Sequence, residues 1–145
     1  DGGNSSGTFT GGDGGDVTLF VIGGRGVRDL RITTSGGENP GGAGDSGEAC
    51  DVMLTLDGVT IEQLTVIADG EAGGQVTVSF INGAAVDLMI VQADGESTPG
   101  TVTLDMEIGT TVTALQMEAA SQTLRVTGGG IVGRMQIGDT AVEGF

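Results

Sequence analysis

The chain has 145 residues, of which 30 are glycine and four are phenylalanine, and it contains no tryptophan, tyrosine, histidine or lysine. Its formal net charge is −15, so it lacks the clustered basic residues with which proteins bind nucleic acid or anionic membranes. The length fits a single domain, and the regular spacing of Val, Leu, Ile and Met argues against a disordered chain.

The chain begins at Asp1 rather than at methionine, and no apolar run approaches the roughly 18 residues that a membrane span needs. We therefore expect a processed protein that is secreted to the cell surface and is not inserted in a membrane. Residues 1–16 are rich in glycine and polar residues, and we expect them to form a flexible N-terminal segment. Asn4 begins an Asn-Ser-Ser sequon and is a candidate N-glycosylation site, with occupancy left open because sequons also arise by chance.

Residues 17–145 are expected to form one repetitive domain, because one sequence pattern recurs in them five times. The pattern consists of two short runs of alternating apolar residues with a glycine between them. The five copies lie near residues 17–32, 52–66, 76–91, 102–117 and 124–137. The glycines between the two runs are Gly23, Gly58, Gly83, Gly109 and Gly130. An internal repeat of this kind is typical of solenoid proteins.

The repeat predicts an all-β fold, because frequent glycine, β-branched residues and period-two alternation all disfavour helix. We favour a parallel β-solenoid of about five coils, in which corresponding residues of successive copies form ladders with a spacing of about 4.8 Å. One such inward ladder would contain Val17, Val52, Val76, Val102 and Leu124. The alternative is an antiparallel meander or sandwich, which is favoured by Asn82-Gly83 because this dipeptide is typical of type I′ hairpin turns.

The segments between the copies vary in length, and several are acidic. The longest, residues 35–50, is expected to be a loop. Residues 68–71 and 93–96 both read Ala-Asp-Gly-Glu at the same place in successive copies, so a parallel stack would bring like carboxylates together. A Ca²⁺ ion would relieve their repulsion, and the alternative is a pair of solvated turns. The candidate calcium ligands are Asp69, Glu71, Asp94 and Glu96.

The side-chain inventory predicts neither a catalytic site nor a cofactor other than this candidate Ca²⁺, and we expect the protein not to be an enzyme. Without His or Lys, the chain has no ordinary base to activate a nucleophile. The single cysteine, Cys50, lies beside Glu48 and Asp51 and has no basic neighbour in the sequence that would activate its thiol. Cys50 is either a small buried residue or one half of an intermolecular disulfide.

Charge and apolar residues both indicate self-association. The arginines lie in the first and last copies and leave an acidic stretch between them: Arg25, Arg28, Arg31, Arg125 and Arg134. The two ends of a solenoid have unpaired backbone groups that invite another chain unless they are capped, and the sequence shows no obvious cap. Apolar residues also occupy outward positions, where alternation should place polar ones: Phe20, Ile22, Ile67, Ile81, Leu88, Ile90 and Ala114. We expect them to form one apolar patch for assembly, and the alternative is that a second layer of the same chain covers them.

The fivefold repeat over residues 17–137, in a lysine-free, glycine-rich and acidic chain, resembles extracellular β-solenoid and β-arch proteins. Within that group it is most similar to fibre and sheath subunits of prokaryotic cell surfaces, such as the tubular sheath protein of methanogenic archaea. The resemblance implies a structural polymer with β-sheets that continue across subunits, in some cases with disulfide cross-links, of which Cys50 permits at most one per chain. We therefore expect a secreted subunit that assembles with itself into a fibre, tube or sheath. The alternative is a monomeric, calcium-stabilised adhesin or spike module that binds cell-surface polysaccharide.

Overall fold

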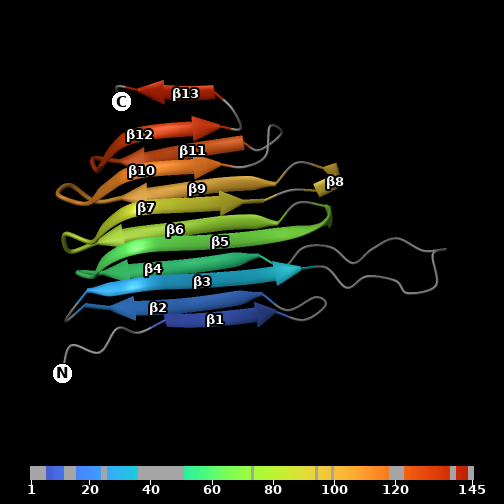
Figure 1. Cartoon of the computed structure of the whole chain (residues 1–145), viewed down its shortest axis with the longest axis horizontal. Helices are drawn as coiled ribbons and strands as arrows, with labels where there is room; N and C mark the ends of the chain where they lie inside the picture. The colour runs from blue at the N-terminus through green and yellow to red at the C-terminus, as the bar shows by residue number, and fades with distance from the viewer. Residues whose placement is uncertain are drawn as a thin grey trace.

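The computed structural model describes residues 6–11, 16–23, 26–35, 51–72, 74–93, 95–98, 100–117, 123–137 and 140–143. Within these ranges the chain consists of β-strands and the turns between them (Figure 1). The strands form two sheets. The short sheet contains β2 (Val17–Ile22), β4 (Val52–Asp57), β6 (Gln75–Ile81), β9 (Thr101–Met106) and β11 (Thr123–Gly128), in that spatial order.

The long sheet faces the short one across the core. Its path is β1 (Ser6–Gly11), β3 (Val27–Ser35), β5 (Thr60–Ala72), β7 (Ala85–Gln92), β10 (Thr111–Met117), β12 (Ile131–Ile137) and β13 (Thr140–Glu143), and β8 (Gly95–Thr98) also pairs with β5. The chain alternates between the sheets, so that each sequence copy gives one strand to each. We call such a pair a rung, and the five rungs are β2–β3, β4–β5, β6–β7, β9–β10 and β11–β12.

Neighbouring strands of successive rungs are parallel, which confirms the solenoid-like stack and shows that the antiparallel meander is wrong. The inward ladder expected from the sequence is present in the short sheet, where the register joins Val17, Val52, Val76, Val102 and Leu124. In the long sheet Leu30 begins a matching column that continues through Leu64, Met89, Leu115 and Met135. Each apolar residue of the repeat therefore lies beside its counterparts in the rungs above and below.

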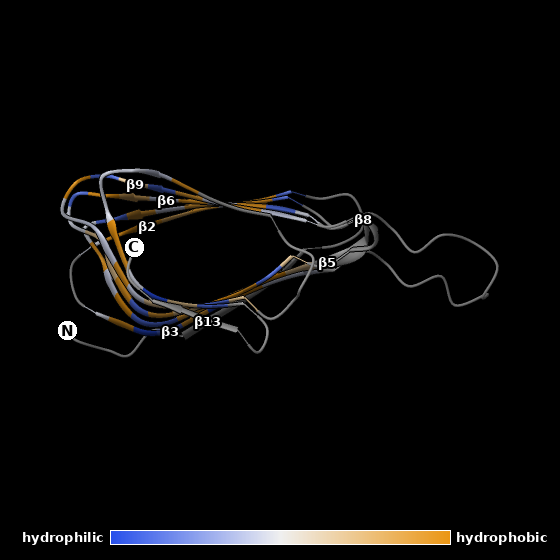
Figure 2. Ribbon diagram, turned by 90° about the horizontal axis from the view of Figure 1, so that it is seen from above, coloured by the Kyte–Doolittle hydropathy of each residue, from blue (hydrophilic) through white to orange (hydrophobic). Residues whose placement is uncertain are grey.

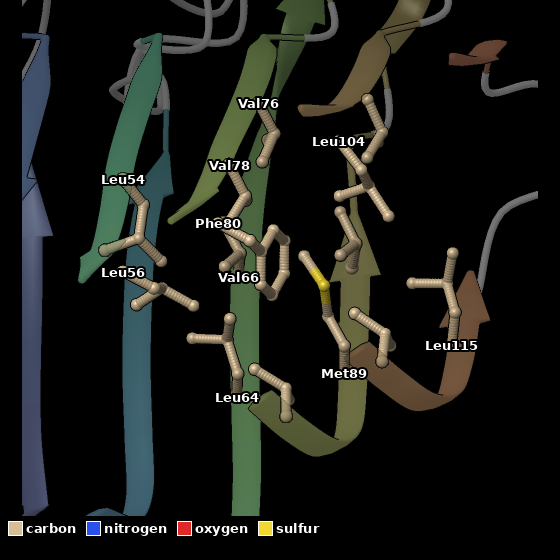
Figure 3. Packing of buried hydrophobic residues seen from close by; sticks show 14 of the residues in the cluster. Leu54, Leu56, Leu64, Val66, Val76, Val78, Phe80, Met89, Leu104 and Leu115 are labelled. Carbon is tan, nitrogen blue, oxygen red and sulfur yellow. The ribbon is translucent and has the colours of Figure 1, made fainter. Parts of the chain in front are cut away.

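The two sheets face each other (Figure 2), and the core is the layer of mostly aliphatic side chains between them. The middle rungs bury it completely: Leu54, Val78, Phe80, Met89 and Leu104 are each 0% exposed (Figure 3). Because alternation along each strand sends every second residue inward, a chain with few aromatic residues still builds a continuous apolar layer.

The turn between β6 and β7 shows why the Asn-Gly dipeptide does not make a hairpin. Asn82 and Gly83 have positive φ angles of 52° and 76°, and the Ala84 amide donates to the Ile81 carbonyl at 3.1 Å, as in a type I′ turn. The two flanking strands nevertheless pair with other rungs, β6 with β4 and β9, and β7 with β5 and β10. The predicted turn is therefore correct, but it connects the two sheets as an arch.

Three segments differ from the sequence-based expectation. Part of the expected flexible N-terminal segment is the strand β1, which pairs in parallel with β3 and sets Phe9 beside Ile32. The acidic residues 68–71, expected as a turn, lie within β5. The last described strand, β13, pairs antiparallel with β12 and covers the edge of the long sheet that was expected to be uncapped. Pairing with a neighbouring strand outweighs the low β-propensity of glycine and aspartate in the first two segments.

Candidate assembly surfaces

The two edges of the short sheet carry inward residues that the core does not fully cover. Leu19 on β2 is only partly buried, although its register neighbour Leu54 is fully buried. At the other end Val126 on β11 is 45% exposed, whereas its neighbour Leu104 is 0% exposed. These residues occupy the same columns and point the same way, so their exposure arises because no further described rung lies beyond them.

The C-terminal end of the core is open between the two sheets. A cavity of about 80 Å³ is lined there by Val126, Gly130, Val132 and Met135. Val132 and Met135 belong to inward columns that are completely covered one rung earlier, at Val112 and Leu115. The cavity is therefore the place where the aliphatic layer stops, rather than a pocket shaped around a small ligand.

The long sheet ends differently, because it extends one strand beyond the short sheet at each end. β1 lies below β3, and β13 lies above β12, while β2 and β11 remain edge strands of the short sheet among the described residues (Figure 1). The N-terminal rung therefore has a covered long-sheet strand and an open short-sheet strand. The same holds at the C-terminal rung.

The outward apolar residues do not form the single patch that the sequence suggested. Ile67, Leu88 and Ile90 lie on the outer face of the long sheet and are half-buried. Phe20 and Ile22 lie on the outer face of the short sheet, which is the opposite face of the molecule, and are 66% and 75% exposed. Ile81 is on the short sheet and Ala114 on the long one.

Sequence reasoning missed other exposed apolar residues. Met53 shares the outer face of the short sheet with Phe20, and Ile108 and Ile131 lie at the turns and strand starts of the last two rungs. Met53 could have been found, since the alternation of Val52, Leu54 and Leu56 already places it outward. On the long sheet, the small Ala114 side chain stands between Leu88 and Arg134 in one column and helps to line a shallow hollow of about 250 Å³.

The arginine side chains that the structure describes are exposed to solvent. Arg28 Nε lies 3.6 Å from Glu62 Oε2 on the next rung, and both side chains are about two-thirds exposed, so the pair contributes little to stability. Arg31 and Arg134 are exposed on the first and last rungs. The side chains of Arg25 and Arg125 lie outside the described residues.

Carboxylates at the turns are held by hydrogen bonds between rungs. Asn82 Nδ2 donates to Asp57 Oδ1 at 2.7 Å, and the Asn82 backbone amide donates to Glu107 Oε2 at 3.1 Å. At the start of the short-sheet strands, Asp51 Oδ1 accepts a hydrogen bond from the Gln75 amide at 2.9 Å. These acidic residues thus connect neighbouring rungs at the surface, and their charge is left to face solvent.

Three of the four candidate calcium ligands lie on neighbouring strands. Gly70 of β5 is the register partner of Gly95 of β8, so the strands that carry Asp69, Glu71 and Glu96 are neighbours. The side chains of these residues, and all of Asp94, lie outside the described part of the structure. Among the described residues no three metal-binding side chains form a cluster that could hold an ion.

Two further sequence candidates, Asn4 and Cys50, also lie outside the described residues. In the described ranges no helix is long and apolar enough to span a membrane. Comparison of the chain with protein-family models, with curated proteins and with solved structures yields no match. The function is therefore inferred from the geometry of the chain itself.

Proposed function

We propose that this protein is a non-catalytic structural subunit that assembles with copies of itself, by pairing of strand edges, into an extracellular fibre, tube or sheath. One observation carries the proposal: inward columns that are sealed in the middle rungs are left partly exposed at both ends of the short sheet. Val126 and Leu19 mark these two ends. A parallel stack with unfilled positions at both ends is suited to continue through another copy.

A second copy fits these ends better than an unrelated partner does. The columns that end at Leu124 and Val126 begin at Val17 and Leu19, so the open end of the aliphatic layer in one copy matches the open end in the next. Complete burial of one Val or Leu side chain contributes about 1.5–3 kcal/mol, and the half-covered end residues would gain a part of this. Backbone pairing where two copies meet would also satisfy the unpaired groups of an edge strand.

The charge of the chain predicts when this assembly occurs. Twenty acidic and five basic residues give each copy a net charge of −15, so copies repel one another at low ionic strength. Raising the salt concentration shortens the Debye length from about 30 Å at 0.01 M to about 8 Å at 0.15 M. We expect light scattering of the dilute protein to rise over this range, and to rise again as the pH is lowered towards the pI of about 4.1.

Negative-stain microscopy of the same samples distinguishes filaments or sheets from the amorphous precipitate that any protein can form near zero net charge. A calcium series at matched ionic strength tests the candidate ligands, since scattering above the NaCl control is expected if Asp69, Glu71, Asp94 and Glu96 bind the ion. Scattering that stays flat in all three series would contradict the polymer. That result would favour the monomeric binding module instead.

A further inference from the structure

The unequal lengths of the two sheets restrict how two copies can meet end to end. If β13 of one copy and β1 of the next were both retained, they would lie between the short-sheet edges β11 and β2. These edges would then be three strand spacings apart, about 14 Å, because neighbouring strands are separated by about 4.8 Å. The exposed inward residues at the two ends could not cover one another across that distance.

β13 is the strand that breaks the pattern of the long sheet. Among the described strands of the two sheets, every other neighbouring pair on the two paths is parallel, whereas β13 runs antiparallel to β12 over four register pairs, from Arg134–Glu143 to Ile137–Thr140 (Figure 1). It follows β12 after only two residues. β13 therefore covers the edge of β12 without extending the solenoid.

β1 has the direction and the register that the edge of β12 requires. In its own copy it is parallel to β3 over six register pairs, with Gly7 beside Leu30 and Phe9 beside Ile32. The columns that begin at Leu30 and Ile32 end on β12, at Met135 and Ile137. A β1 strand from a second copy, placed on β12 in the same register, would continue both columns.

We propose that β12 is an acceptor edge for β1 of a second copy, and that this β1 replaces β13. The inference rests on the proposed self-assembly and specifies its contact. The incoming β1 keeps its pairing with its own β3, so the long sheet runs without interruption from one copy into the next. Only one strand position then remains vacant between β11 and the incoming β2, and the open core of one copy faces that of the next.

This contact has a measurable signature along the filament. Each copy would add six strands to the long sheet, β1, β3, β5, β7, β10 and β12, which gives an axial repeat of about 29 Å. A copy that kept both β1 and β13 at the contact would add seven strands and give about 34 Å, and a copy that released both would add five and give about 24 Å. The repeat therefore gives the number of terminal strands at the contact, and a test on β13 itself shows which strand it is.

A reversible disulfide that holds β13 on β12, called the lock below, tests whether β1 of a second copy replaces β13. Gln136 and Ala141 are register partners on β12 and β13, and opposite residues of an antiparallel pair are within the Cα distance that a disulfide spans. The variant Gln136→Cys/Ala141→Cys is made in a Cys50→Ser background, with bond formation verified by mass spectrometry. We expect the oxidised protein to form no filaments, and the same sample after reduction to form filaments with the repeat of about 29 Å.

Cys50→Ser alone, oxidised and reduced in parallel, is the matched control and should assemble in both states. A chain that ends at Ile137 lacks β13 and should assemble with a shorter lag and the same repeat. Equal filament formation by the oxidised and reduced lock, a repeat of about 34 or 24 Å, or an unchanged lag without β13 would each overturn the exchange while leaving self-assembly intact. If neither the control nor the truncated chain assembles, the proposed function fails as well.

Discussion

Replacing Phe80 by alanine is expected to lower the free energy of unfolding by about 3–5 kcal/mol. Phe80 is 0% exposed and stands in an inward column of the short sheet between Leu56 and Met106, both also fully buried. Its ring points into the layer of side chains between the sheets (Figure 3). Rungs above and below are fixed by backbone pairing, so the layer cannot collapse into the space that the ring leaves.

Phe20→Ala is the matched control, because the same side chain is removed from the outer face, where it is 66% exposed. That change is expected to alter stability by no more than about 0.5 kcal/mol. Urea denaturation at low ionic strength and low protein concentration measures both variants as isolated chains. Equal destabilisation by the two substitutions would mean that Phe80 is not at the centre of the core.

The second large effect is expected at Gly128, where two rungs approach each other closely. Gly128 has a φ of +89° and is the register partner of Met106. The Met106 carbonyl accepts hydrogen bonds from the amides of Gly129 and Gly130 at 2.9 and 3.1 Å, and a Cβ on Gly128 would overlap this carbonyl oxygen. Gly128→Ala should therefore cost about 1–2 kcal/mol for the left-handed backbone and about 1–3 kcal/mol more for the overlap.

Gly109→Ala separates these two contributions. Gly109 has nearly the same φ, +90°, but a Cβ there would meet nothing within 4 Å. Only the backbone cost of about 1–2 kcal/mol is expected for this variant, measured by the same urea denaturation. Similar losses for the two alanine variants would contradict the close approach of the last two rungs.

The sequence was sufficient to predict the fold class, the rungs and the inward columns. Each column consists of residues at equivalent positions of the repeat, so a ladder such as Val17, Val52 and Val76 follows from spacing alone. Strands of successive rungs are parallel because each turn leads from one sheet to the other instead of closing a hairpin. Asn82-Gly83 pointed the other way, because a dipeptide fixes the local backbone of a turn but not the separation of the strands beyond it.

The ends of the stack could not be predicted in the same way. β1 and β13 fall outside the five copies, and their pairing depends on an edge that exists only after the rungs have stacked. All outward apolar residues were also expected in one patch, although the molecule has two outer faces. Phe20 and Leu88 both violate the expected polar alternation, but which of the two outer faces each one joins is decided by the crossing of the chain from one sheet to the other.

X-ray fibre diffraction of aligned assemblies tests the central claim, that the stack continues from copy to copy through its strand edges. We expect a meridional reflection at about 4.8 Å, because strands lie across the filament axis and successive rungs follow it, together with an equatorial reflection near 10 Å from the two facing sheets. Filaments in which the 4.8 Å spacing lies on the equator would show that copies associate through their outer faces. That result would contradict assembly through the ends of the stack.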